Sequence, residues 1–246
     1  IMPSGVVFEK LDLPLFKPSM PGFNDLEPFY NEIARSGYQS NFGPISSRFE
    51  NALAELLGVE YVLALSNLST GIMYMPRAAE LKKGEVICPS FSFLATAHSM
   101  LLGGLTPVFA DIDRTTLTLC PQSVEAAITK NTVAVFGMHT YGNPCDIDAL
   151  QSICDGHGLV LLFDAAHGLG AKYKGERIGS FGLAEGFSTS ATKIFSTLGE
   201  GGFIATNDAS FAENIRYMRN WGHLGDYNAH MPSIVSKLPE LSAAAG

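Results

Sequence analysis

The stretch that decides the fold is Leu159-Val160-Leu161-Leu162-Phe163-Asp164-Ala165-Ala166-His167. Its first five residues are all apolar, so both faces of this segment must be buried. A strand of this kind belongs in a mostly parallel sheet that lies between two layers of helices. Asp164 and His167 follow the strand directly, at the edge where open α/β sheets bind their ligands.

The rest of the chain repeats this alternation of apolar runs and amphipathic segments. Seven apolar runs separated by helical spacing predict an α/β fold with a mostly parallel seven-stranded sheet and right-handed crossovers. The expected strands are residues 61–65, 85–88, 106–110, 133–138, 159–163, 184–187 and 203–206. The expected helices are residues 49–57, 70–81, 94–102, 123–128, 147–157 and 211–220.

Composition excludes several classes of protein. Of the 246 residues 46% are hydrophobic and only 16% are charged, which rules out a disordered chain or a coiled coil. The length suits one large α/β domain or two small ones. A formal net charge of -8 argues against a nucleic-acid partner, because a phosphate backbone is bound by excess positive charge.

One segment has to be tested as a membrane span. Residues 86–110 contain no Asp, Glu, Lys or Arg and are long enough to cross a bilayer. Pro89, Pro107 and the glycines 103–104 interrupt the segment, so a buried strand-loop-helix-loop-strand unit explains it better. Residues 1–10 show no signal-peptide pattern, and the four cysteines are scattered like free thiols. We therefore expect a cytoplasmic enzyme with no membrane partner and no metal site.

Two charged residues that follow predicted strands suggest covalent chemistry. Asp164 is a carboxylate at the end of a buried strand, where it either meets a cationic group or caps the following turn. Lys193 ends the stretch 187–193, which is rich in hydroxyls and contains no acidic residue. A lysine without a carboxylate partner suits imine formation, although most lysines are solvated surface residues.

Two further loops add a possible anion site and a stacking face. Residues 66–71, Ser-Asn-Leu-Ser-Thr-Gly, lie between a strand and a helix, where hydroxyls and free N–H groups can hold a phosphate or merely cap the helix. Phe93 in the stretch 89–96 follows another strand, where its ring can stack on a flat cofactor or pack in the core. A lysine, an acid, a phosphate anchor and a stacking face together suit pyridoxal phosphate.

The order of these parts resembles the DegT/DnrJ/EryC1/StrS family of sugar aminotransferases, from about Pro14 to the last residue. The resemblance implies the large domain of the PLP-dependent transferase fold type I, the fold of aspartate aminotransferase. Its most specific segments are residues 89–97, 106–113, 163–167, 191–193 and 200–202.

The family pattern implies a role for each matching residue. Lys193 matches the lysine that binds pyridoxal phosphate covalently, and Asp164 matches the carboxylate that keeps the pyridine nitrogen protonated. His167 matches the polar residue near the O3' oxygen of the ring, and Phe93 matches the stacking aromatic.

The phosphate of the cofactor is expected on two segments. Ser69, with its neighbours Leu68 and Thr70, matches the phosphate loop, and Ser188 matches the phosphate-binding serine five residues before the lysine. Leu68 stands where Gly or Ala is common and could crowd this loop. Val235 replaces an asparagine that often reaches the phosphate of the neighbouring subunit.

The resemblance also implies an organisation and an activity. Residues 1–35 are expected to form an N-terminal arm and helix. Residues 36–246 are expected to form the PLP-binding large domain, which ends where a C-terminal small domain, largely absent from this chain, would begin. Such enzymes are usually homodimers with a shared active site. They transfer an amino group from an amino acid, here expected to be glutamate, to a nucleotide-linked keto-deoxysugar such as dTDP-4-keto-6-deoxyglucose.

Three other functions stay open from the sequence. A PLP-dependent sugar dehydratase of the same family would carry histidine in place of Lys193. A nicotinamide-dependent oxidoreductase would need G-x-G-x-x-G after a strand, which the sequence lacks. A non-catalytic PLP-binding protein is compatible with the departures at Leu68 and Val235.

Overall fold

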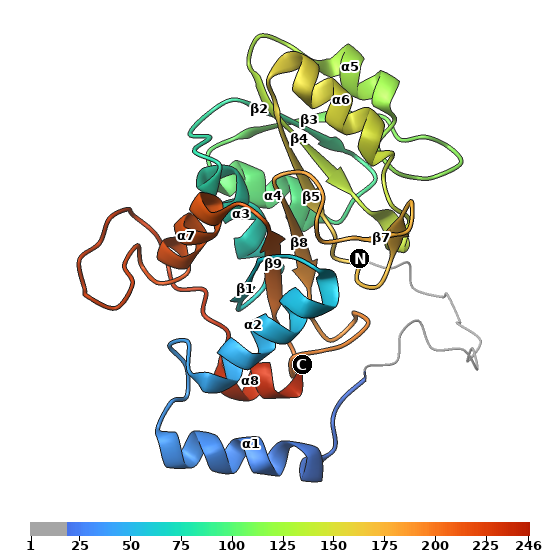
Figure 1. The fold of residues 1–246 in the computed structure, drawn as a ribbon. Coiled ribbons are helices and arrows are strands. Elements are labelled where there is room, and N and C mark those ends of the chain that lie inside the picture. Colours follow the sequence, from blue (N-terminus) through green and yellow to red (C-terminus); the bar gives the residue numbers. More distant parts are fainter. Residues whose placement is uncertain (1–18) are drawn as a thin grey trace, which may run out of the picture.

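A computed structural model describes residues 19–246 and has a seven-stranded sheet at its centre (Figure 1). The strand order is β1-β9-β8-β5-β4-β2-β3. The pairings from β3 through β2, β4 and β5 to β8 are parallel, whereas β9 is antiparallel to both β8 and β1. The strands are β1 (Tyr61–Leu65), β2 (Glu85–Pro89), β3 (Thr106–Ala110), β4 (Thr132–Met138), β5 (Val160–Asp164), β8 (Ala184–Ser188) and β9 (Gly202–Thr206). The mostly parallel seven-stranded sheet is confirmed.

Helices cover both faces of this sheet, as the apolar central strand requires. One core joins the sheet to α2, α5 and α6, and a second core joins its other face to α3, α4 and α7. In β5, Leu161 and Phe163 belong to the first core and Leu162 to the second. The helices are α2 (Pro44–Leu57), α3 (Leu68–Ala78), α4 (Leu94–Leu102), α5 (Pro121–Ala127), α6 (Ile147–His157) and α7 (Ala209–Met218).

The structure differs from the sequence predictions mainly at the ends of elements. Helix α2 begins five residues before the predicted residue 49, because Pro44 occupies its first turn and favours a helix start. Helix α3 runs through Pro76 and ends at Ala78, three residues before the predicted end, and Glu80 already has a left-handed φ of 62°. A short hairpin of β6 (Lys172–Tyr173) and β7 (Glu176–Arg177) was not predicted.

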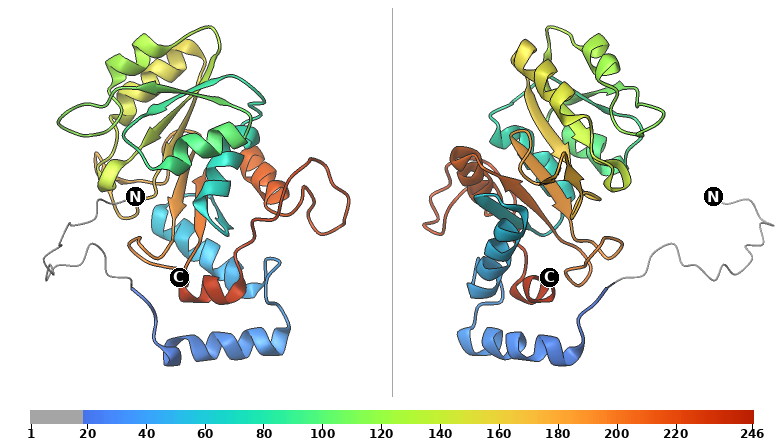
Figure 2. Two further views of the ribbon diagram at one scale, coloured as in Figure 1. Left: turned by 180° about the vertical axis from the view of Figure 1, so that it is seen from behind. Right: turned by 45° about the vertical axis from the view of Figure 1, so that its right-hand side comes forward.

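Two helices lie together at the end of the molecule where the described chain begins and ends (Figure 2). Helix α1 (Phe23–Ser36) packs against α8 (Glu240–Ala245). The predicted N-terminal arm includes residues 1–18, which lie outside the described residues. The boundary between the N-terminal arm and helix (residues 1–35) and the large domain (residues 36–246) stays a prediction.

The uncharged segment 86–110 forms β2, α4 and β3, as its prolines and glycines predicted. Helix α4 contains nine residues. In the part of the chain that the structure describes, no helix combines the length and the apolar character that crossing a membrane requires.

Candidate active site

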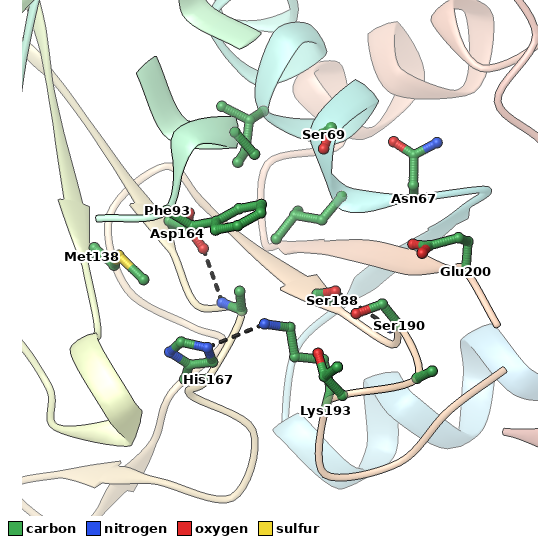
Figure 3. Close-up of a pocket in the computed structure, with 16 residues that line it drawn as sticks. Asn67, Ser69, Phe93, Met138, Asp164, His167, Ser188, Ser190, Lys193 and Glu200 are labelled. Atoms are coloured by element: carbon green, nitrogen blue, oxygen red, sulfur yellow. Dashed lines mark hydrogen bonds between the residues drawn. The ribbon is translucent and has the colours of Figure 1, made fainter. Parts of the chain in front are cut away.

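A cavity of about 340 Å³ lies at the carboxyl end of the parallel strands, beside the start of α3 (Figure 3). Parallel register aligns the ends of β4, β5 and β8, because Met138 pairs with Asp164 and Asp164 pairs with Gly186. The residues that line the cavity are Asn67, Leu68, Ser69, Ile72, Phe93, Ala95, Met138, Asp164, Ala166, His167, Ser188, Ser190, Ala191, Thr192, Lys193 and Glu200.

Asp164 lies on the floor of the cavity and is only 3% exposed. Its Oδ1 accepts a hydrogen bond from the Ala166 N–H at 3.0 Å, and its Oδ2 accepts one from the Thr96 hydroxyl at 2.9 Å. Thr96 itself is 1% exposed, and the Ser92 hydroxyl lies 2.7 Å from the Thr96 hydroxyl. These bonds hold a buried carboxylate in one orientation and satisfy part of the hydrogen bonding that burial demands.

Lys193 reaches the same cavity from the loop between β8 and β9. The base of this loop is closed by backbone hydrogen bonds from Thr189 N–H to Gly201 C=O (3.0 Å) and from Ala191 N–H to Gly199 C=O (2.8 Å). Gly199 has a φ of 125°, a conformation that glycine adopts without strain. The closed loop therefore presents the Lys193 amine to the cavity from a defined position.

His167 links the lysine to the rest of the site. Its Nε2 lies 3.1 Å from Lys193 Nζ, and Tyr141 stacks on its imidazole with an interplanar angle of 5°. Burial lowers the pKa of His167, the nearby Lys193 ammonium lowers it further, and the Asp164 carboxylate opposes these two effects. The neutral imidazole is thus favoured. The buried Nδ1 atom has no hydrogen-bond partner among the described residues.

Polar groups at the start of α3 form the opposite wall of the cavity. The Asn67 side chain caps the helix by accepting a hydrogen bond from the Thr70 N–H at 2.9 Å. Ser69 lines the cavity, whereas Thr70 does not, because its hydroxyl donates to the Asn67 carbonyl (2.9 Å) and lies 2.6 Å from the Ser236 hydroxyl. Leu68 is 6% exposed and belongs to the second core.

Most of the residues expected at the site come together. The cavity contains Lys193, Asp164, His167, Phe93, Ser69, Ser188 and Leu68, and of the residues expected at the site only Thr70 lies outside its lining. Sequence reasoning did not assign Asn67, Ser190 or Glu200, which also line the cavity. It also missed Thr96 and Tyr141, whose contacts with Asp164 and His167 carry no local sequence signal except that Thr96 lies inside the stretch 89–97.

A fully buried ion pair lies next to the backbone of Asp164. His139 and Glu185 are both 0% exposed, and their Nε2 and Oε2 atoms lie 3.2 Å apart. The His139 ring stacks on Phe163, and its backbone N–H donates to the Asp164 carbonyl at 3.0 Å. Glu185 also accepts the N–H of Phe181 at 2.8 Å, so the pair ties three segments of the sheet edge together.

No group of three or more His, Cys, Asp and Glu side chains placed to hold a metal ion occurs between residues 19 and 246. The cavity is lined by one amine, two carboxylates (Asp164 and Glu200), one imidazole and several hydroxyls. This set matches a cofactor-assisted reaction at an amine.

The chain belongs to the DegT/DnrJ/EryC1/StrS aminotransferase family, whose model matches residues 25–246. The dTDP-4-amino-4,6-dideoxy-D-glucose transaminase of Shigella dysenteriae is 37% identical over 238 residues, covering 96% of this chain and 64% of that protein. The chain thus spans less than two thirds of the length of this relative.

Two solved structures illustrate the shared fold. The crystal structure of DesI in the presence of its TDP-sugar product is 41% identical, with a TM-score of 0.88 over 93% of this chain and 58% of that chain. The structure of NtdA from Bacillus subtilis with bound cofactor PMP is 29% identical, with a TM-score of 0.83 over 90% of this chain and 51% of that chain.

Proposed function

We propose that this chain forms the cofactor-binding part of a pyridoxal phosphate-dependent aminotransferase. The enzyme would move an amino group from an amino acid, for which glutamate is the donor to test, to a nucleotide-linked keto-deoxysugar. The observation that carries the proposal is that Lys193 and Asp164 line one cavity, with His167 in contact with the lysine.

The residues of the cavity fit pyridoxal phosphate. A volume of about 340 Å³ lies at the lower end of the range for small-molecule sites and suits a single-ring cofactor. Asp164 provides a buried carboxylate for the pyridine nitrogen, and the start of α3 with Ser69 and Ser188 provides hydroxyls and N–H groups for a phosphate. The buried Nδ1 of His167, which has no partner within residues 19–246, is a polar atom that a ligand could satisfy.

The roles of the side chains follow from their chemistry. Bound pyridoxal phosphate would supply a ring that accepts the electrons released when the donor loses a proton from its α-carbon. Lys193 would hold the cofactor and, once displaced, move that proton as general base and general acid. Asp164 would keep the ring nitrogen protonated, and the neutral His167 would accept or donate a hydrogen bond without adding charge.

The expected partner is a second copy of the chain. Helix α4 presents an apolar face to solvent, in which Leu94, Leu101 and Leu102 are 66%, 56% and 79% exposed. This face begins one residue after Phe93, at the cavity, so a partner that covers it would adjoin the site. We therefore propose a homodimer with a shared active site, located in the cytoplasm, where the free cysteines would stay reduced.

The dimer is tested by sedimentation velocity of a Leu102→Glu variant, in which a charge is placed on the α4 face. The parent protein is expected to sediment as a dimer and the variant as a monomer. Leu56→Glu is the matched control, because Leu56 is 45% exposed on α2. A Leu102→Glu variant that remains dimeric would exclude α4 from the interface.

The activity is tested with the full-length protein, pyridoxal phosphate, glutamate and a panel of nucleotide-linked keto-sugars. We expect 2-oxoglutarate and amino-sugar to form in equal amounts, and we expect Lys193→Ala to abolish both and the borohydride-sensitive visible band of the cofactor. Loss of a sugar hydroxyl without transfer of nitrogen would identify a dehydratase instead. Cofactor binding without turnover of any sugar in the panel would identify a non-catalytic binding protein.

A further inference from the structure

Tyr141 has a conformation that packing within the described chain does not explain. It adopts a left-handed backbone, with φ 53° and ψ 27°, although bulky side chains disfavour this region. Its side chain is nevertheless 75% exposed, so burial does not offset the strain. The ring instead lies parallel to His167, with 5.7 Å between centroids, and meets the edge of Phe91 at 6.4 Å.

These rings form a second cavity beside the first. Its volume is about 200 Å³, and its lining consists of Phe91, Ser92, Phe93, Met138, Thr140, Tyr141 and His167. Phe93, Met138 and His167 also line the first cavity, so the two spaces share a wall. A molecule in the second cavity would contact His167, whose Nε2 lies 3.1 Å from the Lys193 amine.

The lining indicates what kind of group would bind there. The lining contains no Lys, Arg, Asp or Glu. Its one histidine, His167, has a lowered pKa, which favours the neutral imidazole. A diphosphate would gain no cationic partner in such a space. The rings of Phe91, Phe93 and Tyr141 and the three hydroxyls of the lining suit an uncharged ring with one C–H face and several hydroxyl groups. The faces of aromatic rings carry negative charge and attract C–H edges.

We propose that this second cavity binds the hexose ring of the acceptor and that Tyr141 is a specificity-determining residue for it. The assignment rests on the proposed function, because that function supplies the sugar. Of the parts of a nucleotide-linked sugar, the hexose bears the reacting carbon and must lie beside the amine, whereas the base lies beyond two phosphates. The left-handed backbone places the Tyr141 ring over His167, where it would form one face of the sugar site.

The assignment is tested by binding and by steady-state kinetics of the full-length protein. Isothermal titration with dTDP-glucose, which lacks a keto group, reports binding of the nucleotide and the hexose, and titration with dTDP reports the nucleotide alone. Tyr141→Asn removes the ring and keeps a residue that tolerates a left-handed backbone, while Tyr141→Phe keeps the ring. Tyr30→Asn is the matched control, because Tyr30 is 60% exposed on α1 and lines neither cavity.

In Tyr141→Asn we expect the Kd for dTDP-glucose to rise about two- to tenfold, the range for one lost aromatic contact, with an unchanged Kd for dTDP. The KM for the keto-sugar should rise by the same factor as the Kd. Tyr30→Asn should behave like the parent protein, and Tyr141→Phe, which keeps the ring, should lose less affinity for dTDP-glucose than Tyr141→Asn. An equal loss of affinity for dTDP would place the base at Tyr141, and unchanged affinity for both probes would remove Tyr141 from the site. A parent protein that binds dTDP-glucose but forms no 2-oxoglutarate would refute the proposed function while leaving the sugar site in place.

Discussion

Replacing Thr96 with valine would test how the acid of the site is held. The Thr96 hydroxyl supplies one of the two hydrogen bonds that the described residues give to the Asp164 side chain, and both residues are almost fully buried. Valine has nearly the same shape but cannot donate, so one carboxylate oxygen would lose its partner. Hydrogen bonds to charged groups contribute about 1.5–3 kcal/mol, and we expect Thr96→Val to lower the free energy of unfolding by that amount.

The measurement is urea unfolding followed by circular dichroism, with a matched threonine as control. Thr118 is 2% exposed, and its hydroxyl lies 3.0 Å from the neutral hydroxyl of Thr116. Thr118→Val should therefore lower the free energy of unfolding by only about 0.5–1.5 kcal/mol. A double-mutant cycle with Asp164→Asn isolates the contact and should give a coupling energy of about 1 kcal/mol or more between positions 96 and 164.

Two outcomes would refute this reasoning. Thr96→Val could cost no more than Thr118→Val, which would mean that the charge of Asp164 does not strengthen the bond. Alternatively, the cycle could give less than about 0.5 kcal/mol, which is within the additivity expected of independent sites. Either result would leave Asp164 oriented by the Ala166 N–H and the strand alone.

Three further outcomes are expected from other buried groups. Glu240→Gln should lower the free energy of unfolding in urea by about 1–3 kcal/mol. The Glu240 carboxylate is 0% exposed and accepts the Gly43 N–H, and an NH₂ group in its place would leave an N–H at the start of α2 without an acceptor. Gly137→Ala should lower the free energy of unfolding by about 1–3 kcal/mol in the same assay, because a Cβ at position 137 would lie 2.7 Å from the Phe163 ring. The pKa of His167 is lowered from 6.5 in the folded protein, so as pH falls through 6.5 the unfolded chain takes up a proton before the folded protein does. Over this range the free energy of unfolding should fall more steeply with acidification in the parent protein than in His167→Asn.

Much of the sheet could be predicted because its signals are local. The apolar residues of β5 are consecutive, and turn residues mark the ends of the neighbouring strands, so the strand centres matched closely. Asp164 and Lys193 could be placed in one site because each lies at or beyond the end of a strand, and the resemblance then assigned their roles. The antiparallel pairing of β9 could not be read in the same way, because strand direction depends on the connection and not on the apolar pattern.

The contacts that orient the site residues could not be predicted from local patterns. Thr96 and Asp164 are 68 positions apart, and His139 and Glu185 are 46 positions apart. Thr96 lies in the first turn of α4 and Glu185 lies in β8, and each reaches its partner only because the fold brings these elements to the ends of β4 and β5. A threonine or a glutamate in such a segment has no periodicity of its own that indicates a buried partner.

Leu68 shows why a departure from a family pattern cannot be judged at one position. The sequence suggested that its bulk could crowd the phosphate loop. In the structure its side chain packs into the second core, where a Cβ on residue 186 would lie 2.6 Å from Leu68 Cδ1. Gly186 has no Cβ, so the space for the leucine comes from a residue more than a hundred positions later in β8. Because that same glycine pairs with Asp164, the start of α3 and the acid of the site are packed against one strand, and a larger residue at position 186 would disturb both.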